Sequence, residues 1–508
     1  MANPISNAAR LLHAGFVLAR YDALMPTEQL ALAPWPARAV LKIAKFGRSG
    51  EVTRGQQNKL TAALSTLGPS YIKLGQFLAT RPDIIGAKRA FELKALQDRL
   101  PPFADAEARK IVEAELGKPV AQLFKTFGPA IAAASIAQVH KCVTFDGRNV
   151  AVKILRPGVE RRFANDISSF GFAARIAERT SAEGKRLRPT AAVAMLKDSM
   201  KLELDLRMEA AALSEIAQNS KDDPGFRVPA VDWALSSKRV LTSEWIDGTP
   251  MADVETLRAK GFDLPALGDT VIQSFLRHAI RDGFFHADMH QGNLIVDDAG
   301  TLVALDFGIT GRLSEGDRLF LAEILYGFIT RDYMRIAQVH FDAGYIPPSQ
   351  DVNTFAQALR AIGEPIMGLP ADQISMSRLF TQLFEVTEQF QMQTQPQLLL
   401  LQKTMVVTEG VARTLNPNLN IWKAGEPVVR YWIERKLGPI GKLEQLGGSA
   451  LSLGRLALRV PEILNEVHDF TRKMEAHTAL HPPQRWHVPA VWVGALALVV
   501  IALKLVLK

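Results

Sequence analysis

The stretch "HADMHQGN", residues 286–293, places two histidines, an aspartate and an asparagine within eight positions. Two kinds of site contain such residues. On an extended strand, His286, Asp288 and His290 would share one face and resemble the two-histidine, one-carboxylate ligand set of non-haem iron. A phosphoryl-transfer loop instead needs a carboxylate that receives the hydroxyl proton and, five positions later, an amide that holds Mg²⁺. Asp288 and Asn293 have that spacing.

The residues that follow favour the second interpretation. Gly292 and Asn293 precede "LIV" and "LVAL", two short apolar runs around a turn at 297–300, which predicts a loop entering a hairpin. Asp306 of "DFG" stands directly after the second run, where kinases carry a further Mg²⁺-binding aspartate. His290 is then expected to stabilise the loop.

Upstream, the sequence supplies the phosphate-binding half of such a site. "SIAQVHKCVTF", a turn at 146–147 and "NVAVKIL" predict two hairpin strands, with Lys153 on the second. Kinases hold this lysine with a glutamate from a helix, and residues 189–219 have helical periodicity. We therefore predict an α+β, bilobal protein-kinase-like fold.

Two departures from ordinary protein kinases stand out. The Gly-rich loop is replaced by "AIAAASIAQVH", residues 130–140, and alanine adopts positive φ only at a cost, so Ala132, Ala133 and Ala134 predict a stiffer cover. No "APE" follows Asp306, so the platform that docks a peptide substrate is missing. Ordinary protein kinase activity is disfavoured.

From about residue 30 to residue 400 the chain resembles the UbiB family of atypical kinase-like proteins associated with ubiquinone biosynthesis. The motifs that carry the resemblance are "KLGQ" at 73–76, "ELD" at 203–205 and "AAAS" at 132–135. Their presence identifies the chain as a candidate member of that family.

The resemblance implies a role for each matching residue. Lys153 resembles the phosphate-binding lysine, Glu209 its helix partner, Asp288 the catalytic aspartate, and Asn293 and Asp306 the metal ligands. Lys73, Gln76, Glu203 and Asp205 match the family motifs expected near the nucleotide, with Lys73 also among the catalytic candidates. The predicted nucleotide-binding set comprises Ala132, Ala133, Ala134, Ser135, Lys153, Glu209 and Glu244.

The loop departs from the family's "HADPHPGN" at Met289 and Gln291, each replacing a proline. The loss of two φ restraints predicts a less rigid loop without removing a reactive group.

Composition argues against nucleic-acid binding and disulfide bonds and is compatible with a membrane surface. The formal charge of +8 is spread along the chain, without the aromatic-interleaved basic stripe of a nucleic-acid-binding protein. The single cysteine, Cys142, excludes an intrachain disulfide and fits a reducing compartment. A basic excess suits an anionic membrane surface.

The termini predict membrane attachment. "LLHAGFVLA", residues 11–19, precedes Arg20 and Asp22 without a clear cleavage site, which favours an amphipathic helix over a signal peptide. Residues 488–503 carry no charge and would span about 24 Å as a helix, which Leu507 extends to about 30 Å. We therefore expect one C-terminal transmembrane tail with the body in the cytoplasm of a bacterial-type inner membrane; a buried terminal helix is the alternative.

The predicted domains are a helical N-terminal extension with the KxGQ motif, an N-lobe with inserted helices and the ExD motif, a helical C-lobe, a helical segment with linker, and the membrane tail. Their boundaries are 1–118, 119–246, 247–430, 431–485 and 486–508.

The expected activity is hydrolysis of ATP, or phosphorylation of a small lipid-derived molecule, with Mg²⁺ as cofactor and in support of ubiquinone biosynthesis. The expected partners are membrane lipids, polyprenyl-phenol intermediates and enzymes of that pathway, and homodimer formation is left open. A nucleotide-gated scaffold with little turnover is the alternative. A flavin hydroxylase is disfavoured because the chain has no G-x-G-x-x-G turn.

Overall fold

The computed structural model describes residues 4–21, 59–79, 100–180, 187–367 and 396–437, with a few single residues between these ranges. The chain divides into two compact units, Met1–Arg430 and Tyr431–Lys508. Both four-stranded sheets and the candidate site lie in the first unit.

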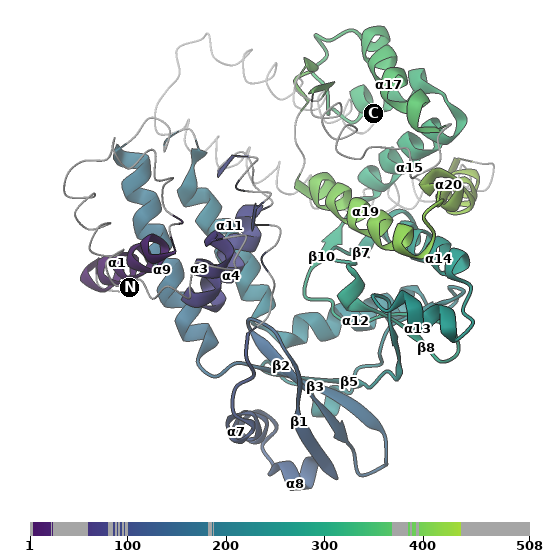
Figure 1. Ribbon diagram of the computed structural model, residues 1–508. Helices are drawn as coiled ribbons and strands as arrows, with labels where there is room; N and C mark the ends of the chain where they lie inside the picture. The colour runs from purple at the N-terminus through teal and green to yellow at the C-terminus, as the bar shows by residue number, and fades with distance from the viewer. Residues whose placement is uncertain are drawn as a thin grey trace, which may run out of the picture. The chain divides into compact units, whose positions relative to one another are not determined.

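The N-lobe is built on a four-stranded antiparallel sheet in the order β1-β2-β3-β5 (Figure 1). Its strands are β1 (Thr126–Ala133), β2 (Ala137–Val143), β3 (Asn149–Leu155) and β5 (Val240–Glu244). Gly147 adopts a φ of +85° in the β2–β3 turn, a conformation that glycine adopts without steric cost. The two predicted hairpin strands are confirmed. β1 was not expected, because its alanine-rich second half lacks the β-branched alternation that marks a strand.

Strand β3 separates the core from the site. Val150, Val152 and Ile154 are buried in a cluster with helices α7 (Asp105–Leu116) and α8 (Val120–Leu123). Because side chains alternate along a strand, Lys153 projects from the opposite face. The hydrophobic pattern of this one strand therefore aims the lysine away from the core.

The described residues between β3 and β5 include the helices α9 (Val159–Thr180), α11 (Pro189–Glu203) and α12 (Leu206–Asn219). The N-terminal helices α1 (Pro4–Arg20), α3 (Lys59–Leu67) and α4 (Pro69–Ala79) gather around α9 (Figure 1). Gly75 of α4 has no room for a side chain, since an added Cβ would lie 2.6 Å from Leu96 and 2.8 Å from Leu64. This small residue permits close packing inside the helical extension.

The C-lobe combines short strands with helices. A second sheet has the order β4-β9-β8-β6, and β7 pairs with β10. The strands are β4 (Phe226–Arg227), β6 (Gly248–Pro250), β7 (Phe284–His286), β8 (Leu294–Asp297), β9 (Leu302–Ala304) and β10 (Thr310–Arg312). The hairpin β8–β9 confirms the two strands predicted after "HADMHQGN".

The helices of the C-lobe begin with α13 (Val254–Ala259) and α14 (Leu264–Leu276). After α14 the chain continues directly into a π-helix over Arg277–Asp282. The later helices are α15 (Glu315–Thr330), α16 (Tyr333–Asp342), α17 (Val352–Met367), α19 (Pro396–Leu415) and α20 (Ile421–Leu437).

Among the described residues, no helix has the length and hydrophobicity that crossing a bilayer requires. The predicted tail at 486–508 lies outside the described residues, so it stays a prediction.

The fold predicts unequal costs for one substitution at two positions of the sheet. Ile154 is fully buried, whereas Ile131 of β1 is 50% exposed. Ile154→Ala should lower the free energy of unfolding by about 2–5 kcal/mol because it leaves a cavity, and Ile131→Ala by less than about 0.5 kcal/mol. Urea denaturation of both variants measures the difference, and equal costs would contradict the described core.

Candidate active site

Three charged side chains from distant parts of the chain meet at the centre of the site. The Lys153 Nζ donates to both carboxylate oxygens of Glu209, at 2.7 and 2.9 Å, and to Oδ2 of Asp306 at 3.1 Å. The side chains of Lys153 and Glu209 are 17% and 8% exposed, while that of Asp306 is 46% exposed. The structure thus brings together the predicted lysine, helix glutamate and DFG aspartate.

Local structure explains how Glu209 reaches Lys153. Asp205 caps α12 by accepting a hydrogen bond from the Arg207 amide, and the Leu206 amide donates to the Lys238 carbonyl just before β5. These bonds fix the first turn of α12 beside the sheet. Glu209 lies in that turn and points at the strand next to β5.

The charges in the cluster stabilise one another. Burial disfavours the charge of Lys153, but Asp306 and Glu209 outweigh it and raise the lysine pKa above its usual value. Burial also opposes the charge of Asp306, yet Lys153 and the Gly308 amide hold the pKa of this carboxyl well below its usual range. Burial raises the pKa of Glu209, although Lys153 favours its charged form. Lys153 and Asp306 therefore stay charged at neutral pH.

Asn293 lies next to Asp306. Its carbonyl accepts from the amide of Leu305, the residue before Asp306, at 2.9 Å. Its Nδ2 donates to the Asp288 carbonyl at 3.1 Å, which orients the side chain and leaves Oδ1 as the oxygen able to bind a cation. A carboxylate and an amide oxygen are ligands that suit Mg²⁺, which binds few protein groups together with substrate phosphates. The residues present fit Mg²⁺.

His286 links the loop of residues 286–293 to the DFG segment. The side chain is buried, its Nδ1 accepts from the Asp288 amide at 3.1 Å, and its ring lies 4.6 Å from that of Phe307. Burial lowers the pKa of His286 to about 4, so the imidazole is neutral and can accept this bond. His286 therefore connects two segments of the structure, whereas the spacing of polar residues had indicated only a possible metal ligand.

The iron interpretation lacks structural support. His290 Nδ1 accepts from the Gly292 amide at 3.0 Å and caps a short 3₁₀ turn, as expected of a loop-stabilising residue. Within the described part of the chain, no three His, Cys, Asp or Glu side chains are grouped to hold a metal ion.

The loop of residues 286–293, which was expected to be less rigid because Met289 and Gln291 replace prolines, is held by contacts with other parts of the chain. Met289 is 1% exposed. Gln291 donates to Thr414 Oγ1 at 3.0 Å, and the buried Thr404 hydroxyl lies 3.1 Å from the Ala287 carbonyl. Both threonines belong to α19. Contacts with this helix and burial restrain the loop where prolines are absent.

The alanine segment forms the end of the β1–β2 hairpin. Ala132 pairs with Val139 and Ala133 with Gln138, and the Ala134 amide donates to the Ala137 carbonyl at 2.8 Å. None of the three alanines has a positive φ, as expected. Ser135 follows in the turn and is fully buried.

Lys73 of α4 and Glu203 of α11 form an ion pair of 2.7 Å, each about 10% exposed. Gln76 lies one turn after Lys73 and is partly buried. The pair joins the helical extension to the end of α11, two residues before the cap of α12.

Two predicted residues have other partners. The Asp205 carboxylate caps α12 and pairs with the Arg207 guanidinium at 2.6 Å. The Glu244 carboxylate accepts from Nη1 of Arg227 at 3.0 Å, and Arg227 also contacts Asp297 at 3.1 Å. The nucleotide-binding role of Glu244 and the position of Asp205 near the nucleotide stay predictions.

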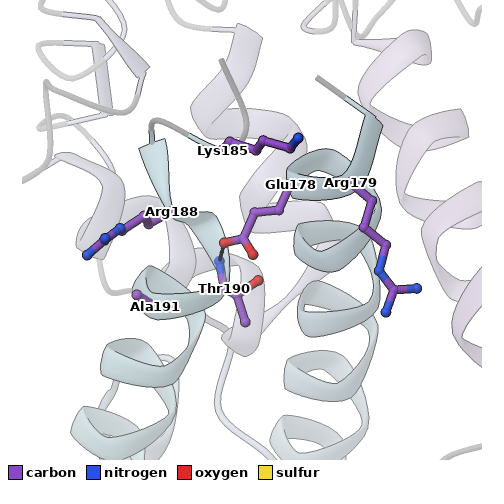
Figure 2. Close-up of a pocket in the computed structure, with 6 residues that line it drawn as sticks. All are labelled: Glu178, Arg179, Lys185, Arg188, Thr190 and Ala191. Carbon is purple, nitrogen blue, oxygen red and sulfur yellow. Dashed lines mark hydrogen bonds between the residues drawn. The ribbon is translucent and has the colours of Figure 1, made fainter. Parts of the chain in front are cut away.

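A separate pocket lies where α9 ends and α11 begins (Figure 2). It is lined by Glu178, Arg179, Lys185, Arg188, Thr190 and Ala191. Glu178 already accepts from the Thr190 amide at 2.9 Å, and Figure 2 shows the guanidinium groups of Arg179 and Arg188 directed away from each other. The pocket contains no predicted site residue.

A strand lysine, a helix glutamate and a DFG aspartate in one ion cluster, beside a braced Asp/Asn loop, define a kinase-like protein. The ABC1 atypical kinase-like domain family matches residues 95–340, and the UbiB helical domain family matches residues 359–420.

Curated relatives named "Probable protein kinase UbiB" match nearly the whole chain. The Marinobacter nauticus protein is 38% identical over 91% of this chain and 84% of its own length. The Pseudomonas aeruginosa protein is 37% identical over 94% of this chain and 90% of its own length. The chain belongs to the UbiB family.

A solved structure is also similar. The Mycobacterium tuberculosis protein Rv3197, in complex with erythromycin, matches with a TM-score of 0.50 and 26% identity, over 73% of this chain and 94% of that one.

The ion cluster predicts an asymmetry between two substitutions. Lys153→Met leaves the Glu209 carboxylate buried without its cation and should cost about 3–5 kcal/mol of unfolding free energy. Glu209→Gln should cost less, because Lys153 keeps its contact with Asp306. Chemical denaturation at constant ionic strength measures both.

The pH dependence provides a control. Without Lys153, the buried Glu209 should have a raised pKa in the folded state, so this group's contribution is favourable below its unfolded pKa and is lost as pH rises through the folded one. The deficit of Lys153→Met should therefore be smaller at about pH 5 than at about pH 8. A deficit that does not change with pH would show that Glu209 is not the unpaired group.

Proposed function

We propose that this protein uses Mg²⁺-bound ATP to support ubiquinone biosynthesis, either by hydrolysing ATP or by phosphorylating a small lipid-derived molecule. The observation that carries this proposal is the contact of Lys153 with Glu209 and Asp306, with Asn293 hydrogen-bonded to Leu305, the residue before Asp306. Membership of the UbiB family and the names of its relatives support it.

Each residue has one task in this proposal. Lys153 provides a fixed positive charge for the phosphates, and Glu209 holds it in place. Asp306 and Asn293 hold Mg²⁺, which neutralises charge on the phosphates when bound. Asp288, on a loop fixed by His286 and α19, orients the attacking water or hydroxyl and receives its proton.

The short segment after Asp306 supports a small acceptor. The chain passes from the DFG motif through β10, which pairs with β7, to the capping box that starts α15 at Ser314. This leaves little chain for an activation segment that could dock a peptide. Water or a small hydroxyl compound is therefore favoured over a protein substrate.

ATP hydrolysis by the purified full-length chain tests the site. Asp306→Asn and Lys153→Ala should each reduce turnover by at least about 100-fold, because preorganised charge provides much of the stabilisation in phosphoryl transfer. Arg312→Ala, which removes an exposed ion pair with Glu215, is the matched control and should keep wild-type turnover.

Unchanged turnover in Asp306→Asn and Lys153→Ala would reject this active site. A nucleotide-gated scaffold would give another result: Asp288→Asn would bind nucleotide and restore ubiquinone synthesis in a deletion strain as well as wild type.

We further propose that the protein acts at the inner membrane, with the body in the cytoplasm and residues 486–508 as its tail. Helix α1 supports contact with lipid. Its Ile5, Leu12 and Phe16 are 76%, 72% and 44% exposed, and their spacing of seven and four places them on one helical face. The helix contains Arg10 and Arg20 but no acidic residue, as in helices that lie on anionic bilayers.

A fluorescent probe tests this orientation without interference from the tail. Cys142 is fully buried, and burial raises its pKa to about 12, so an added surface cysteine can be labelled selectively. A polarity-sensitive dye at Leu12→Cys should shift to the blue and be quenched by brominated lipid in phosphatidylglycerol vesicles. The same dye at Phe145→Cys, a 62% exposed turn residue, should not respond. A shift without lipid quenching would indicate protein contact instead.

A further inference from the structure

Arg156, three residues after Lys153, connects two segments that are distant in the sequence. Its Nε and Nη2 donate to the Ala134 carbonyl at 3.0 and 2.8 Å. Nη2 also donates to the Pro101 carbonyl at 2.8 Å and lies 3.4 Å from that of Leu100. One guanidinium thus binds the turn of the alanine segment and the chain that enters the N-lobe from the helical extension.

The main chain adds a second connection to the same turn. The Arg156 amide donates to the Ile136 carbonyl at 2.8 Å. Both the backbone and the side chain of Arg156 therefore hold residues 134–136, and β3 carries Lys153 about 10 Å away at 3.3 Å per residue. The position of the turn is tied to the strand that bears the phosphate-binding lysine.

The entering chain is held at one further point. The Phe103 amide donates to Gln138 Oε1 at 2.8 Å, and Gln138 Nε2 donates to the Phe103 carbonyl at 3.3 Å. Gln138 is fully buried on β2 and pairs with Ala133. Residues 100–103 are thus bonded on both sides of the alanine turn.

An alanine turn needs such external support. A glycine-rich loop can use positive φ to aim its amides at phosphates, whereas Ala132, Ala133 and Ala134 have no positive φ. The position of a rigid turn relative to the site therefore depends on the residues to which the turn is hydrogen-bonded. Arginine suits this task, because its planar group of five donors can bind several carbonyls at once.

We propose that Arg156 is a positioning residue that sets the alanine turn over the nucleotide phosphates and couples it to residues 100–103 of the helical extension. This inference rests on the proposed ATP-binding function. It assigns to Arg156 an effect on nucleotide binding and none on the chemical step.

Steady-state ATPase kinetics of the full-length chain test the proposal. Arg156→Met should raise KM for ATP by about tenfold, the effect of losing two or three hydrogen bonds to carbonyls, with kcat changed by less than about twofold. Arg156→Lys retains a donor and should fall between this variant and wild type. Arg148→Met is the matched control, since Arg148 precedes the same strand and binds Asp146 and Asp232 instead.

The proposal would be overturned if Arg156→Met had the KM of wild type, or if Arg148→Met raised KM as much as Arg156→Met does. Amide hydrogen exchange without nucleotide gives an independent measurement. Residues 130–137 should exchange faster in Arg156→Met and not in Arg148→Met, even if the wild type hydrolyses no ATP. Unchanged exchange of residues 130–137 in Arg156→Met would refute the positioning role of Arg156. Faster exchange in a protein that binds no ATP would reject only the proposed function.

Discussion

A lysine held between two carboxylates fixes the geometry on which the rest of the site depends. Lys153 comes from the sheet, Glu209 from an inserted helix and Asp306 from the C-lobe, so one ammonium group connects three parts that are distant in the sequence. Removing a charge from water is costly unless opposite charges lie close by. Because of that cost, the cluster holds α12 and the DFG segment against β3.

Around this cluster, two segments are held in place by side-chain contacts, at positions where ordinary kinases have glycine or the family's usual loop has proline. The alanine turn lacks glycine and is held by Arg156, while the catalytic loop lacks two prolines and is held by α19 and by its own histidines. A hydrogen bond from a distant side chain can restrain a segment as a proline does, but it acts only in the folded state. The shape of the site therefore depends on the packing of its surroundings.

Much of the candidate site could be predicted because its chemistry demands particular residue types in a particular order. The β2–β3 hairpin, the β8–β9 hairpin, Lys153 and Asp306 follow from short local patterns, whereas Glu209 was assigned from the family resemblance. Strand β1, the π-helical end of α14 and the partners of Glu244 and Asp205 were not foreseen. Arg227, the partner of Glu244, lies 17 residues before it, so a local pattern does not reveal this contact, whereas Asp205 pairs with Arg207 only two residues later.

The sequence by itself determined the kinase-like class and the candidate site residues, because alternation along β3 and the five-residue spacing of Asp288 and Asn293 act over short distances. Only the tertiary structure decided which side chains restrain them. Arg156, Gln138 and Thr404 bond to carbonyl or amide groups that any residue could supply. A backbone acceptor leaves no mark in the sequence, so these partners become visible only when the chain is folded.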